Sequence, residues 1–105
     1  MVEWYNGRKK NELDKAMADV NKAIALKEDF PFPYWERAEI YILREQYNSA
    51  LADLDKAINL KPDYALAFFT RGKLNYQLKN IDAAKSDIQK AASLGHSAAK
   101  NYQFN

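Results

Sequence analysis

Two pairs of opposite charges recur at one separation, and they are the side chains whose spacing could do polar chemistry. Arg37 precedes Asp53 by 16 residues, and Arg71 precedes Asp87 by the same interval. On two antiparallel helices joined by a short turn, this spacing would bring the groups together. We therefore expect one ion pair within each helix pair. The alternative is solvated charges, because an ion pair at the surface contributes only about 0–1 kcal/mol.

Catalytic and metal chemistry find little support in the sequence. The chain has one histidine, His96, and no cysteine, whereas a zinc site needs about four ligands. No nucleophile motif or glycine-rich phosphate loop is present. Glu36 and Glu39 lie on neighbouring turns, but glutamates of this kind are ordinary on a solvated helix face. We expect no catalytic residue, no metal, no cofactor and no enzymatic activity, and we expect His96 to be an exposed turn residue without a role.

The charge balance limits the classes of partner. The chain has 16 lysines and arginines against 14 aspartates and glutamates, a net charge of +2. This is a surface of mixed sign rather than the basic patch of a nucleic-acid-binding protein. No stretch reaches the roughly 18 apolar residues of a membrane span, and residues 1–10 lack the apolar centre of a signal peptide. We expect no nucleic-acid partner, no membrane insertion and a cytoplasmic location; a trimmed or excised chain is the alternative.

The elements that carry these residues follow a repeat of 34 residues. Residues of the same type recur at this step in three copies: Ala16, Ala50 and Ala84; Asp19, Asp53 and Asp87; Ala23, Ala57 and Ala91. A period between about 20 and 50 residues is the signature of a stacked array. Apolar residues recur at intervals of three and four within each copy, which indicates helices. The predicted fold class is all-α, an α-solenoid of antiparallel helix pairs.

Turn signals divide the chain into seven predicted helices. Their expected ranges are residues 1–10, 12–26, 31–44, 48–60, 64–78, 82–94 and 98–102. Pro31 and Pro33 suit the first turn of the third helix, where backbone N–H groups have no helical partner. Gly95 is predicted to end the sixth helix in a left-handed conformation. Predicted N-caps are Asn48, Asp63 and Ser97.

The pattern inside the period resembles the tetratricopeptide repeat. The second copy carries it on Tyr34, Ala38, Tyr41, Tyr47, Ala50, Ala57 and Pro62, and the third on Phe68, Gly72, Ile81, Ala84 and Ala91. The first copy is shorter by about one helical turn. The resemblance implies one domain in a right-handed superhelix, with a truncated first repeat (1–30), a second (31–64), a third (65–96), and a partial capping helix with a tail (97–105).

Members of this family bind extended or helical peptides in a concave groove lined by the first helix of each pair. The resemblance places there Phe32, Trp35, Glu36, Glu39, Ile42, Leu43, Leu66, Phe69, Thr70, Lys73, Tyr76 and Gln77. Aromatic side chains at a groove are typical binding anchors, so the resemblance implies a scaffold for another protein or peptide. The alternative is that these aromatics pack on neighbouring helices, on the last helix or on a second copy, in a self-associating homo-oligomer.

The family's clamp for the C-terminal carboxylate of heat-shock chaperones is missing from this register. The clamp needs lysine and asparagine in the first repeat, asparagine in the second, and lysine and arginine in the third. The second copy here has Trp35, Glu36 and Glu39, and the third has Leu66 and Thr70. The two glutamates would repel an acidic peptide. We therefore expect no tight binding of such a peptide.

A substitution at one of the small residues of the period tests the predicted register of the repeat. Ala38 against Ala50 would let two helices approach closely while larger side chains fill the gaps around them. We expect Ala50→Trp to unfold the domain, because a side chain of that size overpacks the crossing. Thermal unfolding followed by circular dichroism measures this effect. An unchanged melting temperature would contradict the register.

Overall fold

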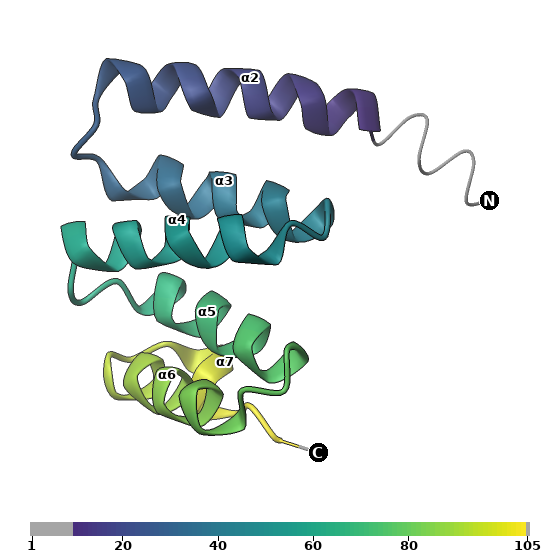
Figure 1. Ribbon diagram of the computed structural model, residues 1–105. Coiled ribbons are helices and arrows are strands. Elements are labelled where there is room, and N and C mark those ends of the chain that lie inside the picture. Colours follow the sequence, from purple (N-terminus) through teal and green to yellow (C-terminus); the bar gives the residue numbers. More distant parts are fainter. Residues whose placement is uncertain (1–9, 105) are drawn as a thin grey trace.

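The computed structural model describes residues 10–104 as a stack of helices that run back and forth (Figure 1). In chain order they are α2 (Lys10–Leu26), α3 (Pro31–Leu43), α4 (Tyr47–Leu60), α5 (Ala65–Gln77), α6 (Ile81–Ser93) and α7 (Ser97–Lys100). Each predicted boundary in this range lies within two residues of the observed one, and the all-α prediction is confirmed. The helix predicted over residues 1–10 lies, apart from Lys10, outside the described residues.

The core forms where the two helices of a pair cross. Ala38 of α3 and Ala50 of α4 are fully buried, and Leu54 is the largest side chain that is fully buried. Burying a leucine contributes about 1.5–3 kcal/mol. In the second pair, Gly72 of α5 and Ile88 of α6 take the corresponding places. Small residues on one helix therefore make room for a large residue on the other, as the period predicted.

Three turns reverse the chain through a residue in the left-handed conformation. Gly95 has φ 97°, which confirms the predicted helix end, whereas Glu45 (φ 60°) and Lys79 (φ 70°) adopt this conformation without being glycine. In each turn the next residue donates a backbone hydrogen bond five residues back: Gln46 to Tyr41 (2.8 Å), Asn80 to Asn75 (2.8 Å) and His96 to Ala91 (3.1 Å). This bond satisfies a carbonyl at the end of each helix.

The predicted N-caps Asn48, Asp63 and Ser97 are wrong. Each of α4, α6 and α7 begins two residues after a left-handed residue, so turn geometry sets the start rather than a capping side chain. Asn48 therefore lies inside α4, and the N-cap residue Gln46 makes no side-chain bond. Asp63 accepts a hydrogen bond from Lys61 Nζ at 3.1 Å. Ser97 is the first residue of α7, and His96 is its N-cap.

The tightest packing in the second pair gives a stability prediction. A Cβ atom on Gly72 would lie 2.8 Å from Ile88 Cδ1 and 2.9 Å from Ile88 Cγ1. Alanine gains about 1 kcal/mol of helix propensity over glycine, but overpacking a core costs about 1–3 kcal/mol. We expect Gly72→Ala to lower the free energy of unfolding by about 1 kcal/mol in urea titrations.

A compensating variant makes this prediction specific. The second copy combines alanine and leucine at the same two places, Ala38 and Leu54. We therefore expect Gly72→Ala/Ile88→Leu to recover most of the loss, with Ile88→Leu alone as the control. A Gly72→Ala variant more stable than the original chain would show that Ile88 moves aside without cost.

Candidate functional site

A row of aromatic rings begins at the turn before α3. Phe30 and Phe32 are 45% and 41% exposed, which is unusual for side chains of this size. The ring centres of Phe30 and Phe32 are 6.4 Å apart, and those of Phe32 and Trp35 are 5.6 Å apart. Pro31 and Pro33 occupy the first turn of the helix and hold its backbone. We call Phe30, Phe32 and Trp35 the aromatic row.

Trp35 anchors the aromatic row to the next repeat. Its Nε1 atom donates a hydrogen bond to Thr70 Oγ1 at 2.9 Å, and Thr70 is only 4% exposed. The bond joins α3 to α5 and fixes the orientation of the indole ring. It also occupies the Thr70 hydroxyl, so the groove position predicted there has its partner within the chain.

Two aromatic residues of the predicted groove in the third copy pack against the end of the chain. Phe69 is 8% exposed; its ring stacks on His96 at 4.6 Å and meets the edge of Tyr102 at 5.8 Å. Tyr76 meets Phe104 at 5.2 Å. The alternative reading of these aromatics, packing on the last helix, therefore describes the third copy.

His96 has structural contacts, so the expectation of an exposed residue without a role is wrong. Besides stacking on Phe69, its Nδ1 atom accepts a hydrogen bond from the backbone N–H of Ala99 at 3.3 Å. The side chain thus caps α7 and covers part of the core. The sequence held one unused signal, because a histidine side chain can accept a hydrogen bond from a helix N-terminus.

The remaining predicted groove residues differ in accessibility. Glu36 and Lys73 are exposed, while Glu39 and Ile42 are half-buried. Lys73 Nζ lies 4.5 Å from the centre of the Phe69 ring, a cation–π contact. Burial, with a smaller contribution from the charge of Glu36, raises the pKa of Tyr64 above its ordinary value. α3 thus presents the negative charge of Glu36 to solvent.

Both predicted ion pairs are present, and both use two parallel hydrogen bonds. Arg37 donates from Nε and Nη2 to Asp53 at 2.7 and 2.8 Å. Arg71 donates from Nε and Nη2 to Asp87 at 2.9 and 2.8 Å. The two aspartates are each 6% exposed, so the alternative of solvated charges is wrong. In both pairs the hydrogen bond to aspartate, opposed in part by burial, raises the pKa of the arginine above its ordinary value.

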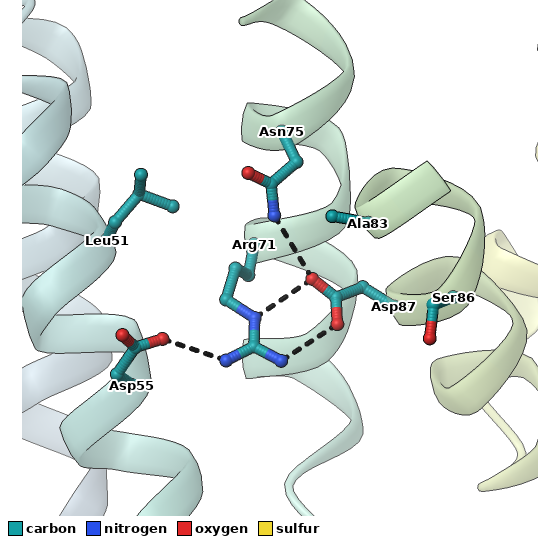
Figure 2. A pocket seen from close by; sticks show the side chains of 7 residues that line it. All are labelled: Leu51, Asp55, Arg71, Asn75, Ala83, Ser86 and Asp87. Carbon is teal, nitrogen blue, oxygen red and sulfur yellow. Dashed lines mark hydrogen bonds and ion pairs between the residues drawn. The ribbon is translucent and has the colours of Figure 1, made fainter. Parts of the chain in front are cut away.

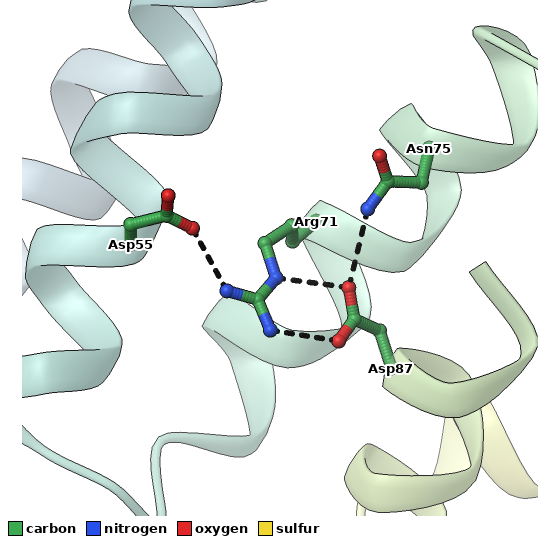
Figure 3. Close-up of polar contacts among 4 residues, drawn as sticks. All are labelled: Asp55, Arg71, Asn75 and Asp87. Atoms are coloured by element: carbon green, nitrogen blue, oxygen red, sulfur yellow. Dashed lines mark hydrogen bonds and ion pairs between the residues drawn. The ribbon is translucent and has the colours of Figure 1, made fainter. Parts of the chain in front are cut away.

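The sequence did not reveal that each arginine also reaches the preceding helix. Arg71 Nη1 donates to Asp55 of α4 at 2.8 Å (Figure 3), and Arg37 Nη1 donates to Asn21 of α2 at 3.0 Å. The partner precedes the arginine by 16 residues in both cases. The sequence did contain a signal, because each arginine stands 16 residues from its partner on either side. The signal emerges only when Asn21 and Asp55 are compared across the repeat.

The same network lines a cleft of about 410 Å³ between α4, α5 and α6 (Figure 2). Its walls are formed by Leu51, Asp55, Arg71, Asn75, Ala83, Ser86 and Asp87. The charged groups point toward one another, and Asn75 Nδ2 adds a hydrogen bond to Asp87 at 3.4 Å. Across the described residues, no buried side-chain nitrogen or oxygen lacks a hydrogen-bond partner. The charged groups that line the cleft are therefore paired with one another.

Two further properties bear on function. Between residues 10 and 104, no three histidine, cysteine, aspartate or glutamate side chains gather closely enough to hold a metal ion. In the same range, no helix has the length and apolar character that crossing a bilayer requires.

Comparison with known proteins gives consistent results at the level of the fold. A TPR repeat model matches residues 38–79, and a tetratricopeptide repeat model matches residues 65–94. Among solved structures, the first TPR of Spaghetti (RPAP3) bound to the HSP90 peptide SRMEEVD is similar, with a TM-score of 0.80 and 24% sequence identity. The likeness covers 94% of this chain and 79% of that one. Among curated proteins, no sequence matches.

The two aspartate partners of Arg71 give a matched pair of variants. The side chain of Asp87 is 8% exposed and that of Asp55 is 59% exposed. Asp87→Asn removes the buried charge that accepts two hydrogen bonds from Arg71 and leaves Arg71 only its exposed partner Asp55, so we expect it to lower the free energy of unfolding by about 2–4 kcal/mol. Asp55→Asn should cost only about 0–1 kcal/mol. Equal losses in urea unfolding would contradict the buried-pair interpretation.

Proposed function

Because this chain is a tetratricopeptide-repeat protein, we propose that it is a non-catalytic scaffold that binds a peptide or a partner helix against the aromatic row. The observation that carries the proposal is the exposure of Phe30 and Phe32 beside a Trp35 ring already held in place. Rigid aromatic side chains lose little conformational entropy on binding and are common binding anchors. Of the third-copy positions, Thr70 supports the row by accepting the hydrogen bond of Trp35, whereas Phe69 and Tyr76 pack against the end of the chain.

Charge beside the aromatic row favours one kind of ligand. Glu36 is exposed and Glu39 half-buried, and both follow Trp35 on the same helix. A peptide with an apolar side chain for the row and a basic residue for these carboxylates is complementary to this face. Lys73 offers an opposite charge on α5 and would help to set the direction of the peptide.

The same charges argue against an acidic C-terminal peptide of the kind bound by the similar TPR structure. Where the family's clamp requires basic and amide side chains, this chain has Glu36, Glu39, Leu66 and Thr70. Thr70 is also buried beneath Trp35 and accepts its hydrogen bond. We therefore infer that this chain uses apolar contacts rather than a carboxylate clamp.

Self-association is the second candidate function. The chain already covers Phe69 and Tyr76 with its own His96, Tyr102 and Phe104. A second copy could cover the aromatic row by the same kind of contact. A monomer by light scattering at high micromolar concentration would remove this candidate, whereas a dimer that Phe32→Ala dissociates would favour it over a partner protein.

The direct test uses peptides selected by the full chain from a displayed library and then titrated by calorimetry. We expect selected peptides to bind with micromolar affinity and Phe32→Ala to weaken them about tenfold, because an anchoring ring loses its contact area. Ile81→Ala is the control, since Ile81 is 38% exposed at the start of α6. Equal loss in both variants would contradict the proposal.

The peptide SRMEEVD is the informative negative probe. We expect no binding at concentrations up to about 100 µM, because Glu36 and Glu39 repel its acidic end. Micromolar or tighter binding would overturn the inference that the clamp is replaced.

A further inference from the structure

The first copy of the repeat has an open face on α2 that the other copies cover. In α4 and α6, the four residues at corresponding positions are all buried: Ala50, Asp53, Leu54 and Ala57, and Ala84, Asp87, Ile88 and Ala91. In α2 only Val20 is buried, while Ala16 and Ala23 are half-buried and Asp19 is exposed. The face thus has the residue types of a helix crossing, but no helix among residues 10–104 crosses it as α3 crosses α4.

A groove marks the place where the crossing helix would lie. It has a volume of about 210 Å³ and is lined by Ala16, Asp19, Val20, Ala23, Glu36 and Ile40. Asp19 and Glu36 give it a negative character. No hydrogen bond or ion pair of Asp19 is found in the described part of the chain, whereas Asp53 and Asp87 each bind an arginine. Among residues 10–104, the groove therefore has no counterpart of the arginine that binds Asp53 or Asp87.

The path of the chain explains why α2 is uncovered. In the two complete pairs, the left-handed turn residue comes eight positions before the aspartate: Glu45 before Asp53, and Lys79 before Asp87. The corresponding position before Asp19 is Asn11, which lies inside α2. Because residue 11 is helical, the described residues hold no left-handed turn at the spacing from Asp19 that is found before Asp53 and Asp87. Position 3, which is 16 residues before Asp19, also holds a glutamate rather than an arginine.

The covered copies specify what fits the groove. On α3, Tyr34 and Ala38 pack in the core with α4, while Arg37 binds Asp53. The neighbouring Trp35 points to α5 and donates to Thr70, and Glu36 is the residue 34 positions before Thr70. A helix lying on α2 in the same way would set an arginine on Asp19 and a hydrogen-bond donor on Glu36.

We propose that the α2 groove is a second interaction surface, which receives one helix of a partner protein. The partner helix carries an aromatic residue that is followed directly by a tryptophan or a basic residue. An arginine stands three positions after the aromatic residue, and a small residue follows the arginine directly. The small residue lets the helix approach Ala16 and Ala23, and the arginine neutralises Asp19 with two parallel hydrogen bonds. This surface lies on α2 rather than on the aromatic row, and it shares Glu36 with the peptide surface proposed above.

The probe for this proposal is a peptide with the sequence of residues 31–44, which carries this pattern as Tyr34, Trp35, Arg37 and Ala38. It is titrated into the isotope-labelled full chain and followed by NMR. We expect saturable shift changes at Ala16, Val20 and Ala23, with a dissociation constant of about 100 µM because so short a helix must be ordered on binding.

Charge reversal tests the predicted ion pair. Replacing the peptide arginine by aspartate should weaken binding at least tenfold, as should Asp19→Arg in the chain, and combining the two should restore it. Because Asp19 is exposed, the Asp19→Arg variant should keep the melting temperature of the original chain. If the melting temperature falls, Asp19→Asn is used in its place. Asp82→Asn, an exposed acid on α6, is the matched control. Binding that ignores these charges would overturn the proposal.

Two further outcomes would also overturn it. Shift changes centred on Phe32 and Trp35 would place the peptide on the aromatic row, and no saturable change up to about 1 mM would leave the groove without a ligand. Because the chain has no cysteine, a single spin label can be attached through Tyr5→Cys. Broadening of the Val20 signals by that label in the free chain would assign the groove to the chain's own N-terminal segment.

Discussion

A carboxylate buried at each helix crossing is the constraint on which the stack depends. Asp53 and Asp87 lie where small residues bring two helices together, and a buried carboxylate is costly unless it is paired. The guanidinium group of the arginine pairs with this carboxylate because its donors point in fixed directions. Its remaining nitrogen donates a hydrogen bond to the preceding helix. One side chain thus sets the positions of three successive helices, which links each repeat to the next.

The same constraint decides what the sequence could predict. The helix pairs and their ion pairs were predictable because the period of 34 and the spacing of 16 are properties of one repeat. The second arm of each arginine depends on packing between repeats, and the covering of Phe69 by His96 depends on the end of the chain. The N-cap at Asn48 failed because the left-handed Glu45 fixed the helix start first.

Equivalent positions in the two described repeats have different surroundings because their neighbours differ. Trp35 and Phe69 occupy the same place in the period, yet the first faces Thr70 beside the exposed row and the second lies under His96 and Tyr102. The family resemblance places both residues in one groove because it describes the geometry of the repeat. It does not describe which neighbouring residues cover each position. The candidate surface is therefore smaller than the groove predicted from the pattern, and it is concentrated on α3.

The junction between the two complete repeats is bridged by three polar bonds at separate points along α5. Trp35 binds Thr70, Asp55 binds Arg71, and Gln77 Nε2 donates to Tyr47 at 3.0 Å. Because two of these bonds lie in the middle of α5 and the third at its last residue, they resist twisting as well as separation. This gives the junction torsional stiffness, because a rotation of α5 about its own axis would stretch its bonds to α3 and to α4 together.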